Sequence, residues 1–197
     1  MVSQEQKGDK TIIKFEQGYN TVANSIRRII LDEVPTMAIE DVEVVENNSP
    51  LYDETVAQRL GLVPLSTDME SYNFKDECSC GGVGCVMCEV KMTLKQDEDG
   101  YVYSSSIKSD DPQVVPVDMD IPITKLFNGS KINLNLKAVM GKGREHSKWA
   151  PAHVYLKESD NSVDLIIEPY GQLDAKTVYN KAIDILSEKI NDLEEQL

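Results

Sequence analysis

The chain has 197 residues, of which 41% are hydrophobic, so it can bury a real core in one or two domains, which excludes wholesale disorder. Its 20 Lys and Arg residues stand against 34 Asp and Glu residues, which gives a formal net charge of −14. Such a charge repels phosphate backbones, and nucleic acid is therefore excluded as a direct ligand of the chain as a whole.

The start of the chain, MVSQEQKGDK, is polar and has no apolar core of the kind that a signal peptide carries. No later stretch approaches the roughly 18 to 20 uninterrupted apolar residues that a membrane span requires. We therefore expect a cytoplasmic protein without a membrane partner.

The N-terminal segment predicts a strand followed by an amphipathic helix. TIIKFEQG has the pattern of a short strand, and NTVANSIRRIILDEVP follows with an N-cap candidate at Asn20 or Thr21 and with Pro35 at its close. The opposite face of this helix carries Arg27 and Arg28. Its apolar residues recur at helical spacing and are Val22, Ile26, Ile29 and Ile30.

From Glu40 to about Leu156 the sequence changes to short strands separated by turns, which is typical of a β-rich region. Apolar and polar residues alternate in EVKMTLK and again in KINLNLKAV, so both are predicted strands. The turn DEDG follows the first of them, and YVYSSSI is expected to return as its partner strand. The stretch SDDPQVVPVDMDIPI, rich in proline and acids, predicts an irregular surface connection.

The last segment predicts a strand, a turn at Pro169 to Gly171 and a long helix. An apolar stripe follows this helix to the final residue, and such a helix needs a partner to cover it. The stripe comprises Val178, Ala182, Ile185, Leu186, Ile190, Leu193 and Leu197.

All four cysteines lie in the loop CSCGGVGCVMC, with the spacing C-x-C-x4-C-x2-C. Disulfides rarely persist in the cytosol, and bridges inside one loop would tie down only that loop. Zinc prefers four thiolates at about 2.3 Å, and two close cysteine pairs across a glycine-rich knuckle can reach that geometry. We therefore predict a structural zinc site without an open coordination position. Its ligands would be Cys78, Cys80, Cys85 and Cys88.

Other interpretations of this loop stay open. Ferredoxin-type iron–sulfur spacings do not match it. A redox pair at Cys85 and Cys88 fits the CxxC pattern, although such motifs begin a helix and this one leads into a predicted strand. The loop could also be reduced and free of metal. A stand-alone thiol- or metal-dependent redox protein is accordingly the alternative function.

The segment GKGREHSKWAP resembles a phosphate-binding loop only superficially, because neither Ser nor Thr follows its GK and Pro151 interrupts any helix. We interpret it as a contact surface for a partner rather than a merely exposed basic connection. His146 and His153 are expected to bond or pack, and the sequence offers no catalytic constellation. The predicted contact residues are Lys142, Arg144, Lys148 and Trp149.

The run from Asn20 to Asp68 strongly resembles the family of archaeal RNA polymerase D subunits. That family is similar to the eukaryotic third-largest polymerase subunit and to the amino-terminal domain of bacterial alpha. The cysteine loop, GKGREHSKWAP and the closing strand and helix match the family in the same order. The resemblance thus covers nearly the whole chain.

The resemblance implies an α+β fold like the amino-terminal domain of bacterial alpha. Residues 1–40 and 160–197 would form a discontinuous dimerisation domain of strands and two helices. Residues 41–159 would form an inserted β-rich domain that carries the cysteine loop, 78–88. The dimer interface would consist of Val22, Ile26, Ile29, Ile30, Val178, Ala182, Ile185, Leu186, Ile190 and Leu193.

The resemblance also implies a role in transcription as a non-catalytic assembly subunit. The chain would pair with subunit L, and subunits N and P and the second-largest polymerase subunit would join this heterodimer. Arg27 and Arg28 match the family's helix-borne arginine pair and would meet large-subunit carboxylates, as would the basic GKGREHSKWAP segment. The four cysteines match the zinc loop of the eukaryotic relative. Nucleotidyl transfer would belong to the two largest subunits.

One departure from the family concerns a ferredoxin-like insertion that many members carry before the final strand. Here the short segment VYLKESDNSV leads directly into DLIIEPYG, and no cysteine follows Cys88. We therefore expect no iron–sulfur cluster.

Overall fold

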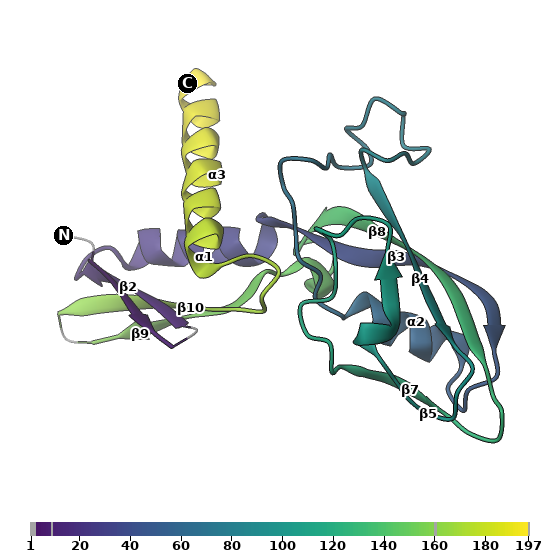
Figure 1. The fold of residues 1–197 in the computed structure, drawn as a ribbon. Coiled ribbons are helices and arrows are strands. Elements are labelled where there is room, and N and C mark those ends of the chain that lie inside the picture. The colour runs from purple at the N-terminus through teal and green to yellow at the C-terminus, as the bar shows by residue number, and fades with distance from the viewer. Residues whose placement is uncertain (1–2, 9, 160, 197) are drawn as a thin grey trace. The chain divides into compact units, whose positions relative to one another are not determined.

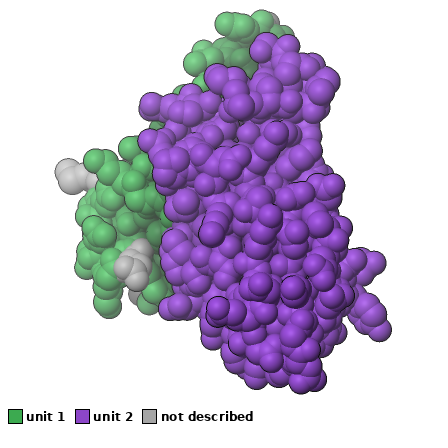
Figure 2. All heavy atoms as spheres, turned by 45° about the vertical axis from the view of Figure 1, so that its right-hand side comes forward, with its two compact units in different colours: residues 1–35, 142–197 green, residues 36–141 purple. Residues whose placement is uncertain are grey.

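The computed structural model describes residues 3–8, 10–159 and 161–196, and the chain divides into two compact units. The first unit comprises Met1–Pro35 and Lys142–Leu197, and the second comprises Thr36–Gly141. Figure 2 shows the two units in different colours. Among the described residues, no helix is long and apolar enough to cross a membrane.

The first unit contains an antiparallel sheet with the strand order β1-β2-β10-β9. Leu165, near the middle of the sheet, lies opposite Ile13 on one side and Leu156 on the other. The alternation in TIIKFEQG places Ile13 and Phe15 on the buried face, as a half-covered sheet requires. The strands are β1 (Ser3–Lys7), β2 (Lys10–Glu16), β9 (Ala152–Glu158) and β10 (Ser162–Pro169).

Two helices, α1 (Asn20–Asp32) and α3 (Ala175–Glu195), contact this sheet and each other. The predicted helices are confirmed, but Tyr19 precedes α1 without a side-chain cap, so neither Asn20 nor Thr21 is the N-cap. Asp174 caps α3 by accepting a hydrogen bond from the Thr177 N–H at 2.8 Å. Figure 1 shows α3 starting beside α1 and then extending away from the sheet.

The second unit contains a sheet with the strand order β3-β8-β4-β6 and a separate ladder of β5 and β7. β3 and β8 also carry the chain between the two units, since Pro35 and Lys142 at their ends belong to the first unit. The elements are β3 (Pro35–Asn47), α2 (Asp53–Gly61), β4 (Glu89–Gln96), β5 (Gly100–Tyr103), β6 (Ile107–Ser109), β7 (Pro122–Leu126) and β8 (Ile132–Lys142).

The core of the second unit follows the alternation seen in the sequence. Met92 pairs with Leu136, and Leu94 pairs with Leu134, so the apolar sets of β4 and β8 lie on one face. Other fully buried side chains from β3, α2, β7 and the connecting loops complete this cluster. They include Met37, Ile39, Val56, Leu60, Leu65, Ile123 and Leu126. The mixed composition of both units confirms the predicted α+β class.

One expectation about the elements needs correction, and two elements were missed. YVYSSSI is not one return strand: β5 pairs with β7, and only β6 pairs with β4. Between them Ser104 is fully buried, and its hydroxyl donates to the Asp118 carbonyl at 2.6 Å, which holds a short 3₁₀ turn, Ser104–Ser106. The helix α2 was not expected, although Val56 and Leu60 have helical spacing. A strand was also not expected at β1.

The unit boundaries also differ from those expected. The first unit regains the chain at Lys142 and not at residue 160, because β9 forms a hairpin with β10 and completes that unit's sheet. The other boundary follows Pro35 and not residue 40. Residues 159–161 join β9 to β10, and residue 160 lies outside the described part of the chain.

Candidate metal centre and interaction surfaces

The four cysteine sulfurs converge on a single point at the edge of the second unit. All four Sγ atoms lie within 4.8 Å of one another. Three of the separations are 3.6 Å for Cys78–Cys85, 3.7 Å for Cys80–Cys88 and 3.9 Å for Cys85–Cys88. These are too long for disulfides, and they match the edges of about 3.8 Å in a tetrahedron with metal–sulfur bonds of about 2.3 Å. The donor set therefore fits zinc.

Backbone amides surround these sulfurs as hydrogen-bond donors. The Cys85 N–H donates to Cys88 Sγ at 3.3 Å, and the Met87 N–H donates to Cys85 Sγ at 3.4 Å. Gly82 and Gly84 lie between Cys80 and Cys85, and their backbone contributes to a lowered pKa of Cys80. Both glycines have positive φ, at 81° for Gly82 and 100° for Gly84, which is why the loop needs glycine here. Such donors stabilise thiolates.

The thiols differ in acidity because their surroundings differ. The hydrogen bond from the Gly84 N–H leads the effects that lower the pKa of Cys80 to about 6. Burial raises the pKa of Cys88 to about 12. Metal ligands must be deprotonated, so a bound cation would have to favour the thiolate of Cys88 against its burial. The loop thus combines an accessible acidic thiol with a buried one.

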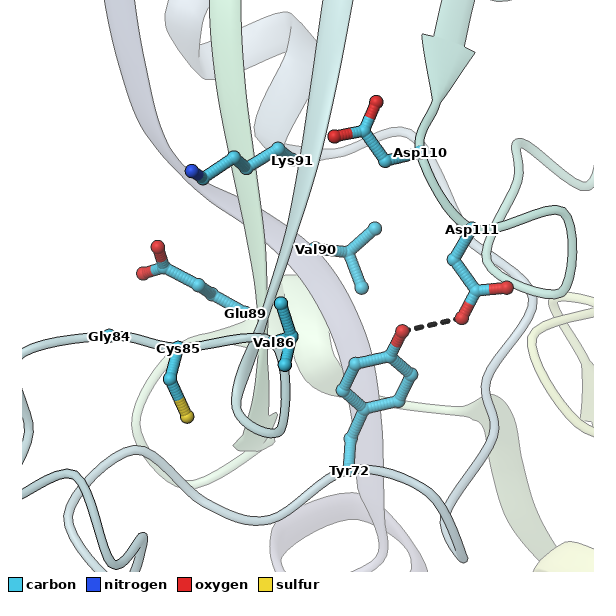
Figure 3. A pocket seen from close by; sticks show the side chains of 9 residues that line it. All are labelled: Tyr72, Gly84, Cys85, Val86, Glu89, Val90, Lys91, Asp110 and Asp111. Atoms are coloured by element: carbon cyan, nitrogen blue, oxygen red, sulfur yellow. Dashed lines mark hydrogen bonds between the residues drawn. The ribbon is translucent and has the colours of Figure 1, made fainter.

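A pocket of about 350 Å³ lies beside the cysteine loop. Figure 3 shows the Tyr72 hydroxyl pointing at Asp111, to which it donates a hydrogen bond, while the Cys85 sulfur and the Glu89 carboxylate point in opposite directions. Burial, followed by this bond, raises the pKa of Tyr72 to about 12. The pocket is lined by Tyr72, Gly84, Cys85, Val86, Glu89, Val90, Lys91, Asp110 and Asp111.

The predicted dimer-interface residues fall into two groups. One group is buried inside the first unit itself, so its burial requires no partner. It comprises Ile26, Ile29, Ile30, Val178 and Ala182. The second group is accessible: Val22, Ile190 and Leu193 are 42%, 48% and 60% exposed, and Ile185 and Leu186 are half-buried. The predicted contact of Leu197 lies outside the described residues.

The basic residues at and after the end of β8 form ion pairs within the first unit. Lys142, Arg144 and Lys189 bring their cationic groups to 3.7, 3.4 and 3.2 Å from the Glu33 carboxylate, whose side chain is 15% exposed. Partial burial raises the pKa of Glu33, but the hydrogen bond from Lys189 and the three charges outweigh it and lower the pKa below its usual value. We call these four residues the Glu33 cluster.

The glycines of GKGREHSKWAP also have a packing role. A Cβ on Gly143 would lie 1.8 Å from the Leu31 carbonyl oxygen, so the backbone passes too close to α1 for any side chain. The Arg144 N–H donates to the Asp32 carbonyl at 3.1 Å in the same place. The motif therefore joins the end of β8 to the end of α1.

Trp149 was predicted to lie on a contact surface, but it is buried. Its side chain is 5% exposed because the 3₁₀ turn Ser147–Trp149 places the indole in the core of the first unit. The Lys148 ammonium lies 4.4 Å from the centre of that ring. His146 accepts a bond from the Lys148 N–H, and His153 packs on a tyrosine ring, as expected for both histidines.

The predicted arginine pair on α1 is divided by exposure. Arg28 is exposed, whereas Arg27 is half-buried and its Nε donates to the Asn24 side chain at 3.1 Å. Arg28 is thus the more accessible of the two for a partner carboxylate.

Comparisons with known proteins agree on one family. Residues 40–154 match the family model described as RNA polymerase Rpb3/RpoA insert domain. DNA-directed RNA polymerase subunit Rpo3 of Methanosphaera stadtmanae is 38% identical over 196 residues, which cover 97% of this chain and 65% of that protein. The subunit of the same name from Methanosarcina acetivorans is 48% identical over 128 residues, covering 64% of this chain and 48% of that protein. The subunit of the same name from Archaeoglobus fulgidus is 39% identical over 150 residues, which cover 76% of this chain and 57% of that protein. The chain thus spans about half to two thirds of the length of these relatives.

Proposed function

This chain belongs to the RNA polymerase Rpb3/RpoA insert domain family, and we propose that it is a non-catalytic assembly subunit of an archaeal DNA-directed RNA polymerase. In this proposal the first unit pairs with subunit L. The heterodimer is then the platform that subunits N and P and the large catalytic subunits join in transcription complexes. The cytoplasm is the expected compartment.

The observation that carries the pairing proposal is the exposed end of the apolar stripe on α3. Val178 and Ala182, in the first turns of α3, are buried. Ile190 and Leu193 on the same stripe remain about half exposed. Covering each of these two side chains would contribute about 1 kcal/mol. Val22 on α1 adds another exposed apolar group in the same unit. An apolar helix face that extends beyond the core of its own unit is suited to pack against the helix of an obligate partner.

The zinc proposal depends on the four sulfurs at the cysteine loop. Their separations fit a tetrahedron, and the surrounding amides stabilise the thiolates that a metal needs. Zinc would close the loop and hold it against β4. Four protein ligands would leave no position for water or substrate, so this centre would be structural.

We assign nucleotidyl transfer to the large subunits and not to this chain. Among the described residues, titratable groups gather in the thiol cluster, in the Glu33 cluster and around the pocket beside the cysteine loop, and none of these three is arranged like a phosphoryl-transfer site. Arg28 and the rim of the basic segment are suited to carboxylates of the second-largest subunit. The net charge of −14 fits a position away from the DNA.

One observation favours the alternative function, a stand-alone thiol redox protein. The pKa of Cys80 is lowered to about 6, mainly by the Gly84 N–H, and reactive cysteines commonly have such acidic thiols. The same amide bonds are expected around a zinc thiolate. Thiol titration with and without a chelator separates the two: rapid reaction of all four thiols before chelation would favour the redox function.

The test of the proposed function is co-expression of the 197-residue chain with and without a candidate subunit L, followed by mass and metal analysis of the same sample. We expect a stoichiometric heterodimer that holds about one zinc per chain. A stable, zinc-free monomer that ignores subunit L would contradict both the pairing and the metal centre.

A further inference from the structure

Glu89 is a carboxylate in an unexpected position. It is the first residue of β4, follows Cys88 directly, and its side chain is only 8% exposed. Its Oε2 atom is buried and lacks a hydrogen-bond partner among the described residues, while the Lys75 ammonium approaches it to 3.8 Å. Burying a carboxylate beside thiolates costs free energy, and one distant ion pair offsets only part of that cost. The burial of the Glu89 carboxylate therefore needs a physical explanation.

The carboxylate lies directly against Gly84. A Cβ on Gly84 would be 2.3 Å from Glu89 Oε2 and 2.7 Å from its Cδ, so the Glu89 carboxylate would have to move away from Gly84. Gly84 directly precedes Cys85, one of the four predicted ligands. The Glu89 side chain thus packs against the backbone that leads into Cys85.

The rest of the loop is fixed by its backbone. The Glu89 N–H donates to the Cys85 carbonyl at 2.9 Å, and the Asn73 N–H donates to the Met87 carbonyl at 2.9 Å. The glycine run 81–84 has positive φ at each of its glycines, a backbone conformation that other residues rarely adopt. A side chain packed against Gly84 restricts the end of this run.

We propose that Glu89, held by Lys75, is a positioning residue for the metal centre: it keeps the backbone at Gly84, and with it the neighbouring ligand Cys85, in place and so slows the release of the metal. This inference rests on the proposed zinc site. Groups that orient metal ligands typically change metal affinity by about 10- to 100-fold when removed. Glu89 acts through Gly84 and is not itself a ligand.

The experiment measures zinc release from the 197-residue chain into excess chelator, together with the thiolate charge-transfer bands of the Co²⁺-substituted protein. We expect Glu89→Ala to release zinc about 10-fold faster, because the packing on Gly84 is lost. Glu89→Gln keeps the shape of the side chain and should stay within about 3-fold of the unsubstituted rate.

Gly84→Ala and Gly82→Ala form a matched pair. Both place a Cβ at positive φ, but at Gly82 it meets only the Lys75 carbonyl at 3.8 Å, whereas at Gly84 it collides with Glu89. We expect release to be at least about 10-fold faster for Gly84→Ala, because the new Cβ displaces the Glu89 carboxylate, and only a few-fold faster for Gly82→Ala. In a Glu89→Ala background, Gly84→Ala should add only the few-fold effect of Gly82→Ala, because the collision is gone.

The outcomes separate this inference from the zinc proposal. If the unsubstituted chain binds neither zinc nor Co²⁺ through its thiols, the metal centre and the role of Glu89 both fail. If it binds metal, but Glu89→Ala leaves the release rate unchanged or the two glycine variants behave alike, the role of Glu89 alone is overturned. Thermal unfolding of each variant shows whether the β core has stayed intact, so that a faster release is assigned to the loop.

Discussion

The two units differ in where they leave apolar side chains exposed. In the second unit, β4, β8, α2 and β7 enclose a core whose largest side chains, such as Leu94 and Leu134, are fully buried. In the first unit, α1 and the sheet cover the start of α3 but leave Ile190 and Leu193 about half exposed. The second unit also exposes apolar side chains, but the most exposed of them, such as Val83, lie in the cysteine loop, whereas Ile190 and Leu193 lie along one stripe of a helix, which suits a partner helix.

The units also use buried carboxylates differently. Glu33 in the first unit meets three cations, and these join α1, α3 and the end of β8. Glu89 in the second unit meets Lys75 and packs against a glycine. The first arrangement ties helices together, and the second restrains a loop. Substitutions in one unit should therefore leave the role of the other intact, and the following predictions test that separation.

The largest effect is expected at the exposed end of α3. Leu193→Asp should weaken binding to subunit L by at least about 100-fold, because a carboxylate would be buried without a partner in an apolar interface. Titration calorimetry of the two chains measures this. Asn191→Asp adds the same charge on another face of the exposed helix end and should bind normally. Equal affinities for the two variants would exclude this end of α3 from the interface.

The next effect concerns the metal centre. Cys85→Ser should reduce the zinc content from about one equivalent per chain to less than about a tenth and loosen residues 76–90, because one thiolate ligand is lost. Elemental analysis and hydrogen exchange of the loop provide the readout. Ser79→Ala lies in the same loop and should retain zinc. Both variants should still co-purify with subunit L, and loss of pairing in Cys85→Ser would show that the two roles are not separate.

A smaller effect is expected in the Glu33 cluster. The three cations lower the pKa of Glu33, so its ion pairs stabilise the fold above the unfolded pKa of about 4.5, and this contribution is lost as the pH falls through the lowered folded value. Glu33→Gln should therefore cost about 1 kcal/mol at pH 7 and progressively less in acid. Denaturant unfolding from pH 7 to pH 3 tests this. Glu188→Gln, exposed on α3, is the control, and a cost for Glu33→Gln that persists unchanged in acid would refute the ion-pair explanation.

The smallest effect is expected at the start of α3. Asp174→Ala should destabilise the first unit by about 1 kcal/mol, because the Thr177 N–H loses its acceptor. Asp174→Asn keeps a capping oxygen and should recover most of that loss. Thermal unfolding measures both variants. If alanine and asparagine destabilise equally, the cap does not account for the stability of this helix end.

Much of the fold could be predicted because it depends on local patterns. The helical spacing from Val22 to Ile30 and the alternation in β4 and β8 correspond to real elements. The cysteine spacing likewise predicts the cluster of sulfurs that the structure shows. The helix α2 could have been found from Asp53 and Glu54 in its first turn. Local signals of this kind need no knowledge of the rest of the chain.

Other features depend on residues that are distant in sequence. The break between β5 and β6 follows from Ser104 bonding to the Asp118 carbonyl, and the boundary at Lys142 follows from the pairing of β9 with β10. Trp149 was expected at a contact surface, and only its burial in the first unit shows that it packs inside. Composition and spacing carry no information about such pairings.

The sequence by itself determined which residues are apolar, where α1 and α3 run and which four thiols can share a metal, because periodicity and short spacing act over a few turns of chain. Only the tertiary structure decided which part of the α3 stripe is left uncovered, since that depends on where α1 and the sheet end. It also brought Lys142, Arg144 and Lys189 to Glu33 and set Glu89 against Gly84. These contacts arise from the packing of whole elements, which no local pattern encodes.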